Sequence, residues 1–201
     1  MNTANTQTKS IDTRQRVLDV ARVIILGKGY AAVGLNEILQ QAGVPKGSFY
    51  HYFKSKDEFG RELMEDYFSD YMVMLEGYLS ESKLSASQRL MRFFEYWLTT
   101  QCSECPEEKC LVVKLSAEVT DLSEKMRIAL AQGVEKVRLR LTRCIAEAIA
   151  AGEISTTESA DELARELYHM WLGATLISKL HRSSDALEAA MKATRQRLTL
   201  D

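Results

Sequence analysis

Hydrophobic residues recur at spacings of three and four along most of the chain, the pattern of helices that bury one face. The longest such stripe runs from Phe59 to Tyr78. Only two prolines and ten glycines interrupt the chain, and long runs are rich in Ala, Leu, Glu, Lys and Arg. These residues favour helices, so we expect an all-α protein of about nine helices without a sheet.

Start and stop signals divide this pattern into separate helices. Residues 1–11 are polar and without periodicity, so we expect them to form a disordered tail. The first helix is expected to begin at Asp12 or Thr13 and to end near Gly27. Further helix starts are expected at five positions where Ser or Asp is followed three residues later by Glu or Gln, a capping-box spacing: Ser55, Ser85, Asp121, Ser155 and Asp185.

The most distinctive stretch is residues 43–56, GVPKGSFYHYFKSK. Gly43 suits a turn, and Pro45 suits the first turn of a short helix. On that helix Phe49 and Phe53 point to one side, while the remainder carries ammonium, phenol and imidazole groups that suit DNA phosphates. We expect the DNA contacts to come from Pro45, Lys46, Ser48, Tyr50, His51 and Lys56.

The preceding apolar stripe, from Leu35 to Ala42, predicts a second short helix that meets the first at Gly43. A helix-turn-helix with a basic, aromatic second helix fits the major groove of DNA. An ordinary helical hairpin with a solvated basic face is the alternative for this stretch alone.

Residues 12–60, and most specifically VPKGSFYHYFKSKDEF, resemble the N-terminal DNA-binding domain of the TetR/AcrR family of bacterial repressors. The resemblance implies a three-helix DNA-binding domain, residues 12–55, followed by a helical domain for ligand sensing and dimerisation, residues 56–201. It also implies a homodimer that represses transcription from a palindromic, double-stranded DNA operator.

Charge is distributed in agreement with this division. Residues 1–60 carry eight Lys and Arg against five Asp and Glu, and the remaining chain carries eighteen against twenty-three. A basic N-terminal segment followed by an acidic remainder is typical of a nucleic-acid binder with a separate regulatory part.

Other classes of protein are disfavoured by the sequence. No window approaches the ~18 apolar residues of a membrane span, and the polar start has no signal core, so we expect a cytoplasmic protein without a membrane partner. The chain has no phosphate loop, no His-rich metal motif and only three histidines. We therefore expect neither an enzyme nor a bound cofactor. A purely structural helical bundle would not explain the basic, aromatic helix.

Residues 171–178, WLGATLIS, are apolar on nearly all sides. A helix with two apolar faces is either central in a core or half of an interface. Together with the helix that begins at Asp185, it is the expected dimer surface, and the family resemblance implies a four-helix bundle between two subunits. The expected interface residues are Trp171, Leu176, Ile177, Leu180 and Met191.

The four cysteines are expected to be reduced thiols in a cytoplasmic protein. Cys102, Cys105 and Cys110 form C-x₂-C-x₄-C, but no fourth ligand completes a zinc site, and we expect no metal. A disulfide between Cys102 and Cys110 is a plausible oxidised state. Cys144 adjoins an apolar stripe and is interpreted as a small apolar filler.

Residues 110–127, CLVVKLSAEVTDLSEKMR, and 171–183, WLGATLISKLHRS, resemble an electrophile-sensing branch of the same family. That resemblance implies that Cys110 is the sensing thiol, that Lys179 accompanies it and that Cys102 is a second cysteine. Thr120 stands where the branch has a cysteine, and Cys105 has no counterpart there.

The expected position of Cys110 also favours a reactive thiol. It opens a helix, where unpaired N–H groups and a nearby ammonium would lower the thiol pKa. A buried structural cysteine is the alternative for this residue. The alternative for the whole protein is a repressor of the same type that is released by non-covalent binding of a small apolar ligand.

Overall fold

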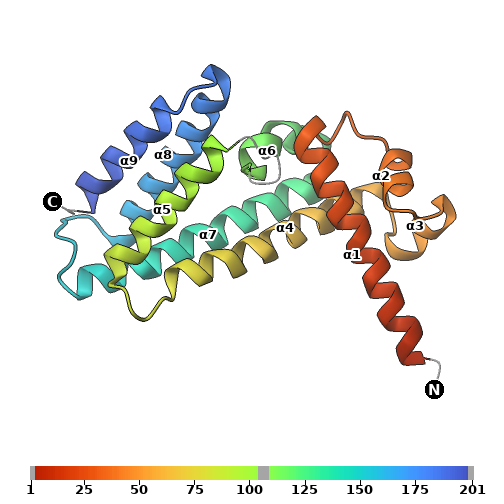
Figure 1. The fold of residues 1–201 in the computed structure, drawn as a ribbon, viewed down its shortest axis with the longest axis horizontal. Coiled ribbons are helices and arrows are strands. Elements are labelled where there is room, and N and C mark those ends of the chain that lie inside the picture. Colours follow the sequence, from red (N-terminus) through yellow and green to blue (C-terminus); the bar gives the residue numbers. More distant parts are fainter. Residues whose placement is uncertain (1–2, 104–108, 199–201) are drawn as a thin grey trace. The chain divides into compact units, whose positions relative to one another are not determined.

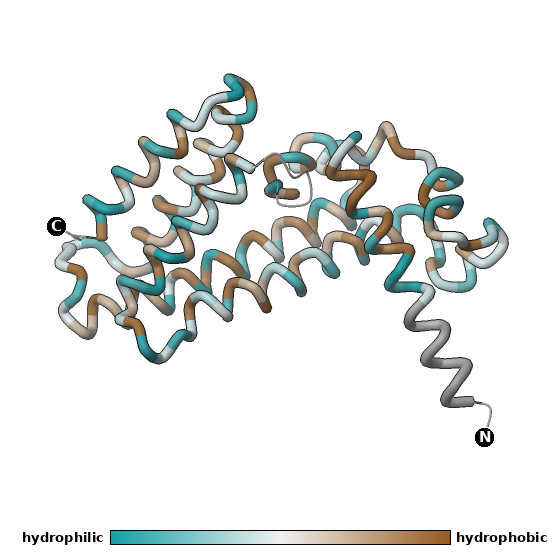
Figure 2. Tube along the Cα trace, in the orientation of Figure 1, coloured by the Kyte–Doolittle hydropathy of each residue, from teal (hydrophilic) through white to brown (hydrophobic). Residues whose placement is uncertain are grey.

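The computed structural model describes residues 3–103 and 109–198. The described residues form nine α-helices and no strand, which confirms the all-α prediction (Figure 1). Apolar and polar residues are interspersed along the coloured parts of the helices (Figure 2), as expected for helices that bury one face. The helices are α1 (Thr3–Lys28), α2 (Leu35–Gln41), α3 (Lys46–Tyr52), α4 (Lys56–Leu79), α5 (Ala86–Cys102), α6 (Leu111–Leu122), α7 (Glu124–Ala150), α8 (Ala160–His181) and α9 (Asp185–Arg197).

The first helix begins earlier than expected, at Thr3 rather than at Asp12 or Thr13. No proline or glycine precedes Gly27, so nothing in the sequence breaks the helix over this range. The predicted tail, residues 1–11, therefore overlaps α1; Met1 and Asn2 lie outside the described residues.

Contacts divide the chain into two compact units. Unit 1 contains Met1–Phe68 and Lys114–Ala131, and unit 2 contains Ser69–Val113 and Gln132–Asp201. Three helices, α4, α6 and α7, contribute residues to both units. These units are defined by contacts alone; the boundary between residues 55 and 56, which follows from the family resemblance, stays a prediction.

Aromatic packing explains why the first half of α4 belongs to unit 1. Phe49 and Phe53 of the helix-turn-helix segment and Phe59 of α4 are all buried. Their ring centroids lie 4.9 to 5.5 Å apart. Such pairs contribute roughly 0.5–1.5 kcal/mol each beyond the area that they bury, so this cluster fixes α3 on the start of α4.

The turn between α2 and α3 has the predicted conformation. Gly43 has a φ of +64°, a left-handed value that other residues rarely adopt. The N–H of Val44 donates to the carbonyl of Leu39 at 2.9 Å and closes the end of α2. Pro45 follows with a φ of −59° and precedes the first residue of α3.

A carboxylate of α6 fastens the loop between α1 and α2 within unit 1. Glu118 accepts hydrogen bonds from the N–H of Tyr30, at 3.1 Å, and from the N–H of Ala31. The phenol of Tyr30 in turn donates to the carbonyl of Lys56 at 3.1 Å. Hydrogen bonds that stabilise an otherwise unpaired loop backbone hold this segment in one conformation.

Unit 2 has an aromatic core formed by α5, α8 and α9. Phe94 stacks on Trp171 with ring centroids 5.1 Å apart. The indole N–H of Trp97 donates to Thr175 at 3.1 Å, and that of Trp171 donates to Thr194 at 2.9 Å. Each buried indole thereby has a hydrogen-bond partner inside the core.

Helices begin as expected after Ser55 and Ser85 and at Asp185. The expected start at Asp121 is wrong, because Asp121 lies inside α6. Ser123 separates α6 from α7, and its hydroxyl accepts a hydrogen bond from an N–H of the first turn of α7. A serine at this position satisfies a donor that the helix itself leaves unpaired.

The expected start at Ser155 is also wrong. The chain leaves α7 through Gly152, which has a φ of +72°, and buries Ile154 before it turns into α8. Ser159 caps α8 in a reciprocal capping box with Glu162. The same residue spacing occurs twice within this segment, and the burial of Ile154 places Ser155 in the connection.

Candidate functional site

Unit 1 presents a basic, aromatic surface along α3. The predicted DNA-contacting residues lie together there, and residues 43–56 contain no Asp or Glu. Tyr50 is 62% exposed although its ring edge contacts the buried Phe49. Ser48 is half-buried, and the exposed members of the predicted set are Pro45, Lys46, Tyr50, His51 and Lys56.

Lys56 and Tyr30 form a pair at the edge of this surface. The Lys56 ammonium lies 5.4 Å from the centroid of the Tyr30 ring, within range of a cation–π interaction. Burial, together with the charge of Asp57, raises the pKa of Tyr30 to about 12. The phenol therefore stays protonated and keeps its hydrogen bond to the backbone of Lys56.

Unit 2 contains the candidate sensing site. Cys110 is half-buried and directly precedes α6. Burial raises the pKa of its thiol, whereas the N–H groups of Val113 and Val112 and the ammonium of Lys179 act in the opposite direction. The structure thus brings together the helix start and the lysine that the sequence predicted.

The prediction that the Cys110 pKa is lowered overall is wrong. Both lowering influences are present, but loss of solvent around the sulfur outweighs them because a thiolate is poorly stabilised away from water. At neutral pH the thiol is therefore mostly protonated, and its reactivity depends on a minor thiolate fraction.

Two residues that the sequence did not single out hold the Cys110 segment. The side-chain carbonyl of Gln101 accepts from the N–H of Cys110 at 3.2 Å. The ammonium of Lys109 donates to the carbonyls of Gln101, at 2.7 Å, and of Thr100, at 3.4 Å, and also to that of Ser103. Cations commonly bind the unpaired carbonyls at a helix end, a signal that would have identified Lys109 once the end of α5 was known.

The other cysteines differ from Cys110 in exposure. Cys102, the last residue of α5, is exposed, and both it and Cys110 are free thiols. Cys144 is fully buried, donates to the carbonyl of Ala86 at 3.5 Å and has a pKa raised by burial to about 11. It is a core residue, as expected. Cys105 lies outside the described residues.

The expected dimer residues separate into two groups. Trp171 and Met191 are buried within their own chain. Leu176, Ile177 and Leu180 of α8 are 53%, 43% and 73% exposed. The exposed apolar face of α8 is therefore narrower than the sequence predicted. None of the helices in the described part of the chain is long and apolar enough to cross a membrane.

Two family models match the chain. The model described as "Bacterial regulatory proteins, tetR family" matches residues 17–63, which include the helix-turn-helix. The model described as "Tetracyclin repressor-like, C-terminal domain" matches residues 86–194.

Individual proteins are similar over most of their length. The HTH-type transcriptional repressor NemR of Escherichia coli K12 is 36% identical over 180 residues, or 90% of this chain and 90% of NemR. The transcriptional regulator AcuR of Cereibacter sphaeroides is 36% identical over 162 residues, or 81% of this chain and 74% of AcuR. The crystal structure of reduced E. coli NemR matches with a TM-score of 0.87 and 34% identity, covering 92% of this chain and 96% of that one.

Proposed function

The chain belongs to the TetR family of bacterial transcriptional regulators, and from this membership we propose that it represses transcription by binding a palindromic DNA operator as a homodimer. We further propose that modification of Cys110 by a small electrophile or oxidant releases the protein from DNA. Members of the family are regulators and not enzymes, and the proposed site of action is the cytoplasm.

One observation carries the DNA-binding part of the proposal. The buried Phe49 and Phe53 hold α3 against the core of unit 1. The solvent-facing side of α3 therefore exposes Lys46, Tyr50 and His51, with no acidic residue among them. Ammonium, phenol and imidazole groups donate hydrogen bonds to phosphate oxygens. Lys46 is the first residue of α3 and is therefore expected also to approach base edges in the major groove.

A homodimer follows from the symmetry of a palindrome, because two half-sites require two recognition helices related by a two-fold axis. Leu176, Ile177 and Leu180 supply an exposed apolar face on α8 that supports this assembly. Trp171 and Met191 are expected to support the interface from within the subunit, since they are buried there.

The sensing step is a reaction of the Cys110 sulfur. The thiol loses its proton, and the thiolate either adds to an electrophilic carbon or is oxidised to a sulfenic acid by hypochlorite. The nearby Lys179 ammonium stabilises the thiolate; its neutral amine is expected to condense with the sulfenic acid, forming a sulfur–nitrogen bond and releasing water. Either product changes volume and charge beside α6.

Helix continuity provides a route from this reaction to the DNA-binding unit. α6 begins at Leu111, directly after Cys110, and also contains Glu118. Glu118 accepts the N–H groups of Tyr30 and Ala31, which precede α2. We expect displacement of α6 to move this loop, and with it the recognition helix, away from its half-site.

The proposal is tested by exposing the purified protein to a quinone or hypochlorite and measuring operator binding beside mass spectrometry of the cysteines. Cys110→Ser should bind the operator with wild-type affinity and remain bound after treatment. Lys179→Met should react more slowly at neutral pH, because loss of the ammonium raises the thiol pKa further. The alkylation rate should rise with pH in both the wild type and Lys179→Met, since more thiolate forms.

Cys102→Ser tests the second cysteine that the family resemblance implies. Cys102 is exposed and lies outside the Cys110 contacts described above. A response weaker than that of the wild type would show that Cys102 takes part, and a wild-type response would limit sensing to Cys110. Release of Cys110→Ser at the wild-type dose would contradict cysteine sensing at this position. Release by an unreactive apolar compound would instead favour the non-covalent alternative.

A further inference from the structure

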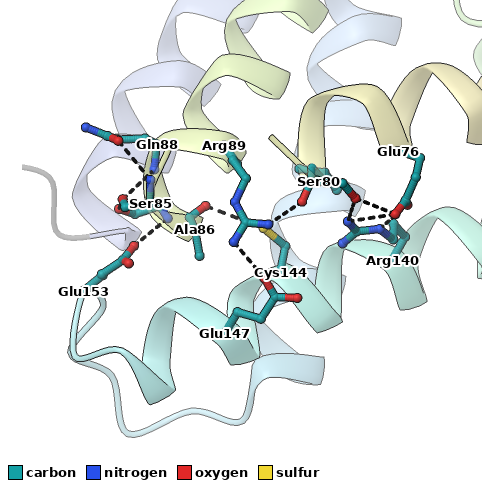
Figure 3. Close-up of polar contacts among 12 residues, drawn as sticks. Glu76, Ser80, Ser85, Ala86, Gln88, Arg89, Arg140, Cys144, Glu147 and Glu153 are labelled. Atoms are coloured by element: carbon teal, nitrogen blue, oxygen red, sulfur yellow. Dashed lines mark hydrogen bonds and ion pairs between the residues drawn. The ribbon is translucent and has the colours of Figure 1, made fainter. Parts of the chain in front are cut away.

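A cavity of about 480 Å³ lies in unit 2, where α4 ends, α5 begins and α7 passes beside them. Figure 3 shows Arg89 reaching from α5 toward Glu147 of α7, and Arg140 reaching from α7 toward Glu76 of α4 and toward Ser80, which directly follows α4. The volume is in the range of small-molecule sites, which span roughly 300–1,000 Å³. Neither the proposed DNA contacts nor the Cys110 site uses these residues.

Two of the arginines are held in place by the surrounding structure. Arg140 is 8% exposed; its guanidinium pairs with the carboxylate of Glu76 and donates to the hydroxyl of Ser80 at 3.0 Å. Arg89 donates to the carbonyl of Leu79 and pairs with Glu147 at 2.7 Å. These contacts orient both guanidinium groups before any ligand arrives, which reduces the entropy lost on binding.

The hydrogen-bonding capacity of the arginines is not exhausted. Nη1 of Arg140 donates to no atom in the described part of the chain. Nε of Arg89 is buried without an acceptor among the same residues. Arg143, one turn along α7 from Arg140, lines the cavity and is exposed, and it forms no ion pair with any residue in 3–103 or 109–198.

Charge in the cavity is positive on balance. Its lining contains three arginines and two glutamates. The hydrogen bonds from Arg140 and Ser80 hold the pKa of Glu76 below its usual range, so this carboxylate is ionised at neutral pH and already committed to Arg140. The charge of Arg143 also acts on Glu76, but within residues 3–103 and 109–198 Arg143 forms no ion pair, so its guanidinium donors remain for an external partner.

We propose that this cavity binds a small free anion bearing a carboxylate or phosphate group. Arg143 contributes a guanidinium without an ion pair in the described part of the chain, Arg140 contributes its Nη1 donors, and Ser82, which also lines the cavity, supplies a hydroxyl donor. Guanidinium groups recognise the planar edge of carboxylate and phosphate oxygens, and their charge-assisted hydrogen bonds are the strong ones.

A purely structural network is the competing explanation, and Arg143 distinguishes the two. The pairs of Arg89 and Arg140 join α4, α5 and α7 and would stabilise the fold without any ligand. Arg143 has no such pair, so removing its charge should leave this network in place. Loss of anion binding in an Arg143 variant therefore reports on the ligand and not on folding.

The test uses the full-length protein without DNA, with inorganic phosphate and citrate as probes and sodium chloride at equal ionic strength as reference. Isothermal titration calorimetry should detect binding to the wild type, and Arg143→Gln should weaken it roughly tenfold, the loss expected for one charge-assisted hydrogen bond. Lys136→Gln is the matched control, because Lys136 is an exposed cation on the same helix that does not line the cavity.

Hydrogen–deuterium exchange locates the bound anion. Anion binding in the cavity predicts that phosphate protects residues 76–89 and 138–147 from exchange. This protection should be lost in Arg143→Gln and kept in Lys136→Gln. Protection confined to residues 45–56 would place the phosphate on the recognition helix and overturn the proposal. Equal affinity in both variants, or no binding beyond the chloride reference, would overturn it as well. Operator binding is measured separately, so failure here leaves the proposed repressor function untouched.

Discussion

Cys110 and Cys144 carry the same thiol in different surroundings. Burial raises the pKa of both thiols; helix-start N–H groups and the Lys179 ammonium oppose this effect at Cys110, and the charges of Arg89 and Arg140 oppose it at Cys144. Cys144 is fully buried and its pKa reaches about 11. Cys110 is only half-buried, whereas no reagent can reach the fully buried Cys144 in the folded protein, so electrophile chemistry is expected at Cys110.

Lys56→Ala should weaken binding to all DNA sequences to a similar extent, because a lysine–phosphate contact carries no base information. The slope of log K against log salt should fall by about one contact. Fluorescence anisotropy over a salt series measures both quantities. Lys136→Ala is the control of equal charge change, and an unchanged slope in Lys56→Ala would argue against a phosphate contact.

Gly60→Ala should destabilise unit 1, because the added Cβ would overlap Sδ of Met126 and lie 2.7 Å from the phenol oxygen of Tyr30. The Met126 side chain is flexible, but the Tyr30 phenol is held by its hydrogen bond to the Lys56 carbonyl. Overpacking of this kind costs roughly 1–3 kcal/mol, which urea unfolding measures.

Gly77→Ala is the matched control on the same helix, because no atom lies within 4 Å of the Cβ that it would add. It should stabilise the protein by up to ~1 kcal/mol through helix propensity. Equal changes in the free energy of unfolding for the two substitutions would show that Met126 and Tyr30 do not approach Gly60 closely.

At the scale of elements, the start of a helix depends on side chains that accept hydrogen bonds from the unpaired N–H groups of its first turn. Ser159 and Glu162 form a reciprocal capping box at the start of α8. Ser155 has the same sequence spacing to Glu158 but lies in the connection, outside any helix. Only one of two equivalent patterns therefore contributes to the stability of α8.

Ser159→Ala should lower the free energy of unfolding by about 1 kcal/mol, since an N–H of the first turn loses its acceptor. Ser155→Ala should leave it unchanged within about 0.5 kcal/mol, as for other exposed positions. Thermal and urea unfolding of the two variants compare them directly. A larger loss in Ser155→Ala would mean that α8 begins where the sequence first indicated.

At the scale of the whole molecule, two units share three continuous helices. A regulator needs this property, because a signal received in one unit has to change the other. The exposed apolar face of α8 lies in unit 2, so we expect dimerisation and sensing in that unit and DNA contact in unit 1.

Leu176→Glu should give monomers, because a charge buried at a subunit interface lacks both water and a partner. Loss of the dimer should also lower operator affinity, since one DNA-binding unit contacts only one half-site. Sedimentation equilibrium measures the assembly state. Leu139→Glu, which changes an exposed leucine of α7, is the control; an intact Leu176→Glu dimer would move the interface elsewhere.

The sequence by itself determined the helical fold, the helix-turn-helix around Gly43 and the family. Periodicity, turn residues and short motifs act between near neighbours, so a linear pattern records them. The same locality explains why the exposed side of α3 was predictable from the spacing of Phe49 and Phe53.

Tertiary structure decided the properties that depend on distant segments. The net pKa of Cys110 reflects how much protein surrounds the sulfur, and the burial of Trp171 depends on α5 and α9 packing against it. The arginine cavity joins residues from α4, α5 and α7, which no local pattern associates. Desolvation and electrostatics sum over everything near a group in space, so they are determined only when the chain has folded.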